Sequence, residues 1–598
     1  MARLDRLGEE GKRTVQLASV IGRQFPRRLL ERIGGLSGEL DGLLQELKAL
    51  EIIYEQGLLP EPAYIFKHAV IQDVAYQSLL VQRRKEIHRA VGGAIEELYP
   101  DRLAEHYEEL AHHFVAGEQW PEAFRYSILA GDRAAHAFAS AEARRHYAQA
   151  LEVAPRAQPA PRDRELASVH EKLGGVLFIL AEFEAAVAEF ERALALIRRS
   201  GDRKQEVATL LGLANVYNWG HKIAEVLATV NGALAIAIEI GDTAGQAGCH
   251  ALRGEARSAV YGPVIEAMAD SSEAVRLARE AGDARLLAQC LTFAGRHLEW
   301  HGEYDVADGH LREGLGLARR EHPGYLVGLA LYHLGHAALA RGDYEGALEH
   351  YRSLLEYAEA AGDKLYLARL PNLFGGVSLE TYDLDEAIRF NTEGDETSRR
   401  LWPWPEPRGH SLWKLGLAHL YRGDHGGAER AFRDAESLRE LDTWGRWTWE
   451  ISLWRSRGEL ALAEQNYDEA WTWASRSLEA ATQCRQRKHA ARAMRLQGEI
   501  LAAQGRLPDA ARALTTSLDQ ARALGTARES WIGHAALGRV FTRLGQDREA
   551  EAQLTAAADM IESMAAKLVT PRLRQSFLAA PPVADVFQTL GRRRRDHS

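Results

Sequence analysis

Histidine and glutamate side chains gather between residues 106 and 113 of this 598-residue chain. His106, Glu109, His112 and His113 stand one to four positions apart, so on a helix they occupy neighbouring faces and could offer ligand atoms to zinc. A structural zinc site needs four ligands that converge on one ion, and because these residues are spread over neighbouring faces, the fourth converging ligand is missing. We therefore predict no metal site here and expect a helix that packs against the aromatic residues of 120–124.

Residues 8–14 read Gly-Glu-Glu-Gly-Lys-Arg-Thr, which superficially matches a phosphate-binding loop. That loop requires a glycine five positions before its second glycine and a serine or threonine after the lysine. Arg6 and Arg13 occupy those two positions, and no strand is predicted before the segment. We predict a polar turn of a helix, and no cofactor bound by this chain alone.

Nine of the 13 tryptophans fall between residues 402 and 473. Exposed aromatic side chains are good anchors for a partner peptide or another ligand, whereas buried ones fill wide gaps between helices. Both readings stay open, and residues 401–407 are predicted to form a stiff, proline-rich loop between helices. The candidate partner-binding residues are Trp402, Trp404, Trp413, Trp444, Trp447 and Trp454.

A repeated spacing of small residues organises most of the chain. In eight copies of a repeated unit, glycine precedes an anchor alanine by twelve positions, for example at Gly335 and Ala347. Successive copies are 40–42 residues apart, a period that is typical of solenoids. The anchor positions are Ala186, Val226, Ala267, Ala307, Ala347, Ala387, Ala428, Ala470, Ala510 and Ala550.

Each copy is long enough for two helices and two short turns. Within residues 325–361, apolar residues recur with helical spacing, stop at Gly342-Asp343 and resume from Tyr344. This pattern resembles the tetratricopeptide repeat (TPR), with longer helices than the usual unit. We predict about ten helix pairs over residues 161–566, forming an elongated superhelix with a concave surface, then a capping helix and basic tail over 567–598.

Composition limits the functional classes. A net charge of −10 argues against a general nucleic-acid binder, so nucleic acid is an unlikely partner. Three widely separated cysteines match no metal or redox spacing, which favours a reducing cytoplasm. Apolar runs stay shorter than the roughly 18 residues of a membrane span, and the first residues lack a signal core. We therefore expect a cytoplasmic protein without a membrane partner.

The first hundred residues are predicted to form a small separate domain. Helices are expected near residues 4–20, 27–33 and 40–50, with Ser37 as a plausible cap of the third. Short β-type runs at 51–55 and 63–67 are joined by the turn-rich segment 57–62. Three helices followed by a hairpin is the layout of a winged helix. Residues 101–160 then form a helical bridge and linker, in which the step from Gly131 to Ala143 indicates repeat-like packing.

Three segments of this region resemble bacterial STAND-type signalling ATPases, particularly those with an adenylate or guanylate cyclase domain in front. The segments are residues 17–25, residues 66–80, and Arg83-Arg84 followed by His88. In that family the order is cyclase, P-loop ATPase, winged helix and TPR array. The resemblance implies that this chain corresponds to the last two parts: an all-α TPR-like solenoid preceded by a winged helix with one β-hairpin.

The resemblance also implies a role for His68. Residues 67–73 are similar to the Met-His-Asp motif of STAND winged helices, whose histidine contacts the phosphates of bound ADP, although Lys67 and Ala69 replace its methionine and aspartate. His68 would then sense ATP or ADP, but only with an ATPase core supplied upstream or in trans. The alternative is an ordinary residue that caps the junction between wing and helix.

Together these features predict a non-catalytic sensing and interaction module. Its array would bind a protein or small ligand on the concave face and regulate a STAND ATPase and a linked cyclase region, in cis or in trans. We find no nucleophile–base arrangement and no cyclase aspartates, so we do not expect an enzyme. The alternative is a winged-helix transcriptional regulator with a TPR effector domain, although residues 40–50 carry a single lysine, Lys48, among acidic residues.

Overall fold

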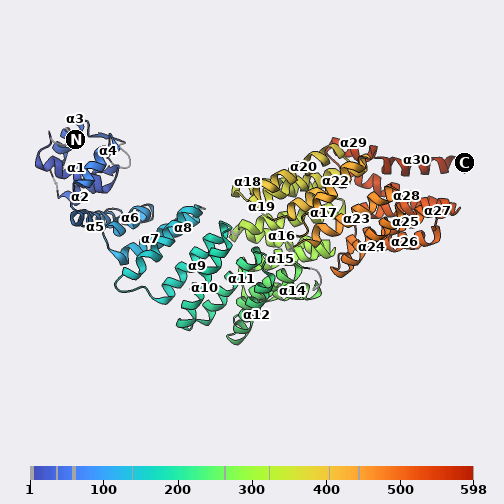
Figure 1. Cartoon of the computed structure of the whole chain (residues 1–598), viewed down its shortest axis with the longest axis horizontal. Coiled ribbons are helices and arrows are strands. Elements are labelled where there is room, and N and C mark those ends of the chain that lie inside the picture. The colour runs from blue at the N-terminus through green and yellow to red at the C-terminus, as the bar shows by residue number, and fades with distance from the viewer. Residues whose placement is uncertain are drawn as a thin grey trace. The chain divides into compact units, whose positions relative to one another are not determined.

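The chain is almost entirely helical and divides into two compact units, residues 1–216 and 217–598 (Figure 1). The computed structural model describes residues 6–35, 38–56, 62–137, 139–260, 264–321, 324–402, 404–441 and 445–596. None of the described helices combines the length and the apolar character needed to cross a membrane.

The first unit begins with three helices and a three-stranded antiparallel sheet of strand order β1-β3-β2. The predicted hairpin is present as β2 and β3, while its tip and the proposed cap Ser37 lie outside the described residues. Strand β1 was not predicted, because three residues ending in proline show no alternating pattern; Phe25 fixes it by packing on Phe66. The elements are α1 (Glu9–Ile21), β1 (Gln24–Pro26), α2 (Arg27–Gly34), α3 (Leu40–Ala49), β2 (Ile53–Glu55) and β3 (Ala63–Phe66).

Helices then continue to the end of the first unit, and repeat-type packing begins at α7. The helices are α4 (Ala69–Gln77), α5 (Val81–Leu98), the 3₁₀-helix η2 (Pro100–His106), α6 (Tyr107–Ala116), α7 (Trp120–His136), α8 (Ser140–Val153), the 3₁₀ turn η3 (Ala154–Arg156), α9 (Asp163–Ile179), α10 (Phe183–Ser200) and α11 (Arg203–Trp219), which crosses the unit boundary. Gly131 faces the ring of Tyr147 in the same way as Gly174 faces Phe190.

The second unit continues the helix pairs and ends with two further helices. They are α12 (Ile223–Glu239), α13 (Thr243–Ser258), α14 (Val264–Ala281), α15 (Ala284–His301), α16 (Tyr304–Glu321), α17 (Gly324–Arg341), α18 (Tyr344–Ala361), α19 (Lys364–Glu380), α20 (Leu384–Leu401), α21 (Glu406–Arg422), α22 (His425–Glu436), α23 (Trp447–Ala463), α24 (Tyr467–Gln483), α25 (Arg487–Ala503), α26 (Leu507–Ala523), α27 (Ala527–Arg543), α28 (Asp547–Lys567), α29 (Pro571–Ala579) and α30 (Pro581–Asp596). The repeat register therefore predicts the pairs from α9 onward.

The recurring glycine makes room for a large side chain of the second helix. A Cβ atom on Gly174 would lie 2.9 Å from the ring of Phe190, and one on Gly538 would lie 2.7 Å from Leu554. Each of these large residues stands four positions after the anchor alanine, one helical turn further on. The anchor alanine is itself fully buried, as at Ala186, so the twelve-residue step encodes helix packing.

Repeats that are far apart in sequence contact one another within the second unit. The indole Nε1 of Trp447 donates to the carbonyl of Ser258 at 3.0 Å, and the backbone N–H of Gly445 donates to the carbonyl of Ala259 at 2.9 Å. Arg487 pairs with Glu303, 184 residues away, at 2.8 Å. Repeats five units apart are therefore in contact, a feature that the predicted elongated superhelix did not include.

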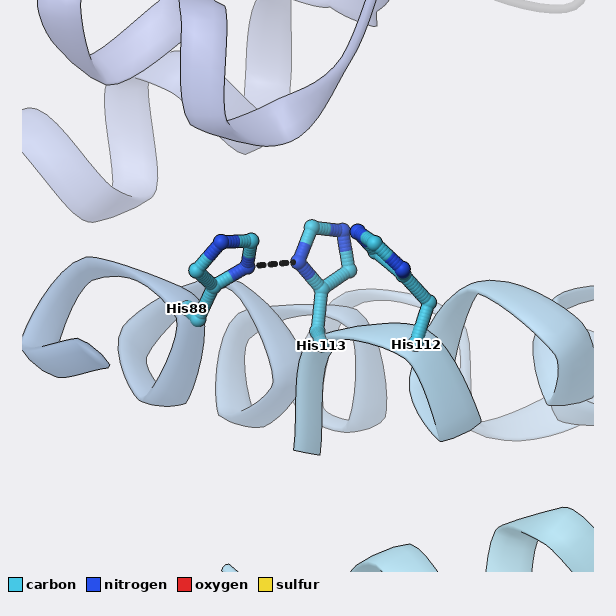
Figure 2. Close-up of side chains that lie close together, drawn as sticks. All are labelled: His88, His112 and His113. Carbon is cyan, nitrogen blue, oxygen red and sulfur yellow. Dashed lines mark hydrogen bonds between the residues drawn. The ribbon is translucent and has the colours of Figure 1, made fainter. Parts of the chain in front are cut away.

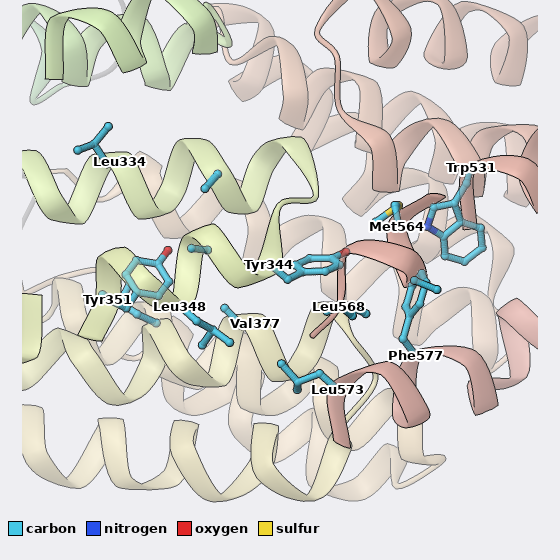
Figure 3. Close-up of a cluster of buried hydrophobic side chains, with 14 of the residues drawn as sticks. Leu334, Tyr344, Leu348, Tyr351, Val377, Trp531, Met564, Leu568, Leu573 and Phe577 are labelled. Atoms are coloured by element: carbon cyan, nitrogen blue, oxygen red, sulfur yellow. The ribbon is translucent and has the colours of Figure 1, made fainter. Parts of the chain in front are cut away.

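One large apolar cluster joins the middle of the second unit to its C-terminal helices. Figure 3 shows Tyr344 of α18 near Phe577 of α29, with Trp531 of α27 on the other side of Phe577. The ring centroids are 6.5 Å apart for Tyr344 and Phe577, and 6.4 Å apart for Trp531 and Phe577. The C-terminal helices therefore pack against an earlier repeat as well as the last one.

Candidate functional site

His68 stands at the N-terminal boundary of α4, directly after strand β3. Its side chain is exposed and makes no capping hydrogen bond, although its backbone occupies the cap position. The neighbouring Lys67 pairs with Glu51 at 3.2 Å. His68 is therefore accessible to a ligand or partner, and its role in nucleotide sensing stays a prediction.

The candidate tryptophans differ in exposure. Trp413, Trp447 and Trp454 are buried, while Trp402 and Trp404 are partly exposed. Trp444 lies outside the described residues. The three buried rings pack inside the array, which matches the gap-filling alternative, and a partner-binding role stays a prediction, most readily for the two partly exposed rings.

The buried tryptophans make specific contacts. Trp447 packs edge-on against Trp300 at 5.0 Å and hydrogen-bonds to α13, so it bridges distant repeats. The guanidinium carbon of Arg476 lies 4.1 Å from the ring centre of Trp454. The ring of the partly exposed Trp404 faces His221 at 4.4 Å.

Charged residues are buried on the first helices of the repeats in the second unit. Salt bridges and hydrogen bonds connect many of them, from one repeat to the next and across the array. Those with almost no exposed surface are Glu255, Arg296, Glu299, Arg369, Glu406, Lys414, Glu450, Arg455, Arg492, Arg495, Arg528 and Glu529. We refer to this set as the inner polar face.

Arg492 of α25 is at the centre of one such network. Its Nε atom donates to Glu529 at 2.6 Å, and its Nη2 atom donates to Glu380 at 3.0 Å. Burial alone raises the pKa of the Glu529 carboxyl, but the guanidinium groups of Arg492 and Arg528 outweigh burial and hold that pKa far below its usual range. Glu529 is therefore ionised, and its charge depends on these arginines.

A second network joins α19 to α21. Arg369 donates two hydrogen bonds to one carboxylate oxygen of Glu406, at 3.0 and 2.8 Å. Although burial raises the pKa of Glu406, Arg369 and His410 lower it to about 2. Lys414 donates to the backbone and side-chain oxygens of Asn372, and burial lowers its pKa to about 8.

Glu299 of α15 is the exception among these acids. His333 of α17 contacts it at 3.0 Å, and no arginine is paired with it among the described residues. Burial raises the pKa of Glu299 to about 8, slightly reduced by Lys488. This carboxyl therefore titrates near neutral pH, unlike Glu406 and Glu529.

Several buried polar atoms of the second unit have no hydrogen-bond partner within the described part of the chain. Donors and acceptors both occur among them, and such atoms are normally paired with protein, water or a ligand. They include Asn372 Nδ2, Trp454 Nε1, Arg455 Nε and Trp531 Nε1 as donors, and Glu380 Oε2, Asn391 Oδ1 and Glu529 Oε2 as acceptors. These atoms are also buried, so a polar ligand could pair with them only if the packing around them opened.

The sequence interpretation missed the inner polar face. A signal was available, because charged residues recur on first helices that are otherwise apolar, such as Arg369 in α19 and Arg492 in α25. Their partners lie on other repeats, such as Glu406 for Arg369 and Glu529 and Glu380 for Arg492, and the repeat period does not specify which side chains pair.

Comparison with known proteins supports the repeat assignment. The family model described as tetratricopeptide repeat matches residues 329–360, which lie in the α17–α18 pair. No curated protein matches this chain.

Solved structures also match this chain at low sequence identity. A STAND protein with a tetratricopeptide repeat sensor from Pyrococcus horikoshii is 14% identical, with a TM-score of 0.46, over 72% of this chain and 63% of that chain. This chain therefore spans less than two thirds of that protein's length. A Rap protein complexed with Competence and Sporulation Factor is 13% identical, with a TM-score of 0.46, over 61% of this chain and 99% of that one.

Proposed function

We propose that this chain is a non-catalytic sensor whose TPR array binds a polar ligand, most simply a peptide, at the inner polar face. The observation that carries the proposal is the set of buried charges and unpaired polar atoms on the first helices of the second unit. Burying a charge is costly unless it is paired, and an array that only needed stability would use apolar residues there.

The chemistry of the inner polar face favours a peptide. A peptide backbone offers N–H and C=O groups in alternation, and the buried polar atoms without a partner in the second unit include both donors, such as Arg455 Nε, and acceptors, such as Glu529 Oε2. Arginine and glutamate side chains of both signs would recognise the charged termini or side chains of such a ligand. A ligand that enters here would change the contacts that join distant repeats, including the hydrogen bond between Trp447 and Ser258.

The output of the sensor would be a STAND-type ATPase, in cis or in trans, as the similarity of residues 17–25 and 66–80 implies. A ligand can shift the closed-to-open equilibrium of such a switch only by its difference in affinity for the two states. His68 supports this role by its exposure at the start of α4, where it could reach a nucleotide held by another domain.

The binding proposal is tested with a library of displayed linear heptapeptides selected on the full chain. We expect selected peptides to bind wild-type protein in solution, and Lys414→Met to weaken them at least tenfold because Lys414 belongs to the inner polar face. The matched control is Lys364→Met, an exposed lysine of the neighbouring helix α19. Equal affinities for both variants, with both folded by circular dichroism, would contradict the proposal.

The switch proposal needs a separate measurement. ADP and ATP binding are measured for this chain alone and with a STAND ATPase core supplied in cis or in trans, for the wild type and for His68→Ala. We expect binding only when the ATPase is present, and weaker ADP binding with the variant. Identical ADP affinities would remove His68 from the mechanism but leave the peptide test unaffected.

A further inference from the structure

Three histidine rings of the first unit meet between α5 and α6 (Figure 2). His88 lies on α5, and His112 and His113 lie on α6. The ring centroids are 5.1 Å apart for His88 and His113, 5.6 Å for His88 and His112, and 5.2 Å for His112 and His113. One nitrogen from each ring lies within 4.8 Å of the other two.

Two of the rings are held in place by further hydrogen bonds. The Nδ1 atoms of His88 and His113 face each other at 2.9 Å, while Nε2 of His88 lies 3.1 Å from the hydroxyl of Tyr76. The ring of His113 is also hydrogen-bonded to the backbone of Ile21. Outer partners of this kind orient the histidine ligands of metal sites.

The third ring is accessible from solvent. His112 is exposed, whereas His88 and His113 are buried. His112 and His113 line a cavity of about 600 Å³, whose walls include Ile21, Glu105 and Glu109. An ion could therefore enter from the cavity side, and water there could complete its coordination.

We propose that His88, His112 and His113 bind one divalent transition-metal ion, with zinc as the reference ion. Three imidazole nitrogens and one water form a common tetrahedral zinc site with an open position. Zinc–nitrogen bonds of about 2.0–2.1 Å place tetrahedral ligand atoms about 3.4 Å apart, so the two Nδ1 atoms need to separate by only about 0.5 Å.

The protons of these rings can rearrange so that the ion replaces the hydrogen bond between the two Nδ1 atoms. Without an ion, one of the facing Nδ1 atoms must donate to the other. If His88 is the donor, its Nε2 atom accepts from Tyr76, and metal binding moves the proton from Nδ1 to Nε2, which then donates to the Tyr76 oxygen. The ring stays neutral throughout, so no proton needs to leave the site.

The ion would add a cross-link between helices that already contact one another. It would link α5 to α6 directly, and through Ile21 and Tyr76 it would involve α1 and α4 of the N-terminal domain. The sequence interpretation discounted a metal because it looked for a fourth ligand within residues 106–113. His88 is 24 positions before His112, and only the pairing of α5 with α6 brings them together.

A second group, Glu299, His333 and His336, also has ligand atoms within 4.8 Å of one another, so the experiment must separate the two sites. Full-length protein stripped with a chelator is titrated with Zn²⁺ by calorimetry and with Co²⁺ by visible absorption. We expect one tight ion per chain and the absorption of tetrahedral cobalt. His112→Ala should weaken binding of that ion at least 100-fold.

Two variants serve as matched controls. His136→Ala removes an exposed histidine of α7 outside the cluster, and His336→Ala disrupts the second group. Both should bind the tight ion like the wild type. The proposal fails if the wild type binds no zinc, if His136→Ala weakens binding as much as His112→Ala, or if only His336→Ala abolishes it.

A further variant tests the outer partner. Tyr76→Phe removes the hydroxyl that orients His88 and should weaken zinc binding about tenfold without changing the cobalt geometry. Unchanged affinity would show that the hydroxyl does not orient the ligand and would count against the site.

Discussion

Ion pairs between repeats have different surroundings in the two units. In the first unit, Arg144 of α8 pairs with Glu182 near the start of α10 at 2.7 Å, and both side chains are about half exposed. In the second unit, Arg492 and Glu529 join α25 to α27 with side chains only 8% and 4% exposed. The same type of repeat therefore produces a solvated pair in one region and a desolvated pair in the other.

The difference shows what the repeat pattern does and does not determine. The glycine–alanine step determines how a first helix packs on the second helix of its own repeat, and it is present in both units. The inner polar face lies in the unit where repeats far apart in sequence also contact one another, as Trp447 contacts Ser258, and the step does not specify such contacts. Charged side chains can stay buried there only if they are accurately paired, because the free-energy cost of removing a charge from water is offset only by an ion pair of good geometry.

The largest expected effect is on the buried network. Glu529→Ala leaves Arg492 and Arg528 buried without their shared carboxylate, so we expect a loss of about 3–5 kcal/mol in the free energy of unfolding of the second unit. Tryptophan fluorescence during urea unfolding measures this, because 12 of the 13 tryptophans lie after residue 216.

The matched change in the first unit is Arg144→Ala. It removes a half-exposed pair, and we expect a loss of less than about 1 kcal/mol, measured by far-ultraviolet circular dichroism during the same unfolding. Comparable losses for the two variants would mean that burial does not distinguish the two networks.

Much of this architecture could be predicted from the sequence. The period predicted the helix pairs, and β-type runs on either side of a turn predicted the hairpin. Strand β1 could not be predicted, since Gln24-Phe25-Pro26 becomes a strand only by pairing with β3. The C-terminal helix α30 was expected only as a basic tail, because its run of arginines at 592–595 suggests a solvated end.

The candidate sites were harder to predict, for a physical reason. Trp447 and Trp454 have the residue type of a binding anchor, and only contacts across the array show that they are buried. His88 and His112 are separated by a helix end and a 3₁₀-helix, so no spacing rule links them. Sequence periodicity reports neighbours within a repeat, whereas these sites consist of residues from different elements.

The next effect concerns the contact between distant repeats. Trp447→Phe removes the donor to the Ser258 carbonyl and leaves a gap beside Trp300, so we expect a loss of about 2–3 kcal/mol. Limited proteolysis should also cut the α22–α23 connection faster. Trp471→Phe, at a ring that is 39% exposed, is the control and should match the wild type in both measurements.

A smaller effect should appear in how the free energy of unfolding of the second unit depends on pH. Burial raises the pKa of Glu299 to about 8, above its unfolded value of 4.5, so the folded state holds this proton more tightly. Its contribution to stability is complete below pH 4.5 and is lost as pH rises through 8. Between pH 6.5 and pH 8 this group alone should lower stability by about 2 kcal/mol, measured as the difference in slope between the wild type and Glu299→Gln, because the histidines titrate over the same range in both proteins.

Glu299→Gln should remove that slope, and Glu349→Gln, at an exposed glutamate of α18, should retain it. Urea unfolding at four pH values from 6.5 to 8 measures the difference. Parallel slopes for the two variants would place the titrating group elsewhere.

The smallest expected change in stability is at His68, and a small change would allow an effect of this variant on nucleotide response to be interpreted. The side chain is exposed and makes no capping hydrogen bond, so His68→Ala should change the free energy of unfolding by less than about 0.5 kcal/mol. Glu529→Ala and Trp447→Phe change stability whatever their effect on a ligand, because their side chains belong to the packed interior. A change in nucleotide response caused by His68→Ala could instead be attributed to lost contacts with the nucleotide or its ATPase. If thermal unfolding showed that this variant is destabilised by 2 kcal/mol or more, His68 would be a structural residue of the junction between β3 and α4.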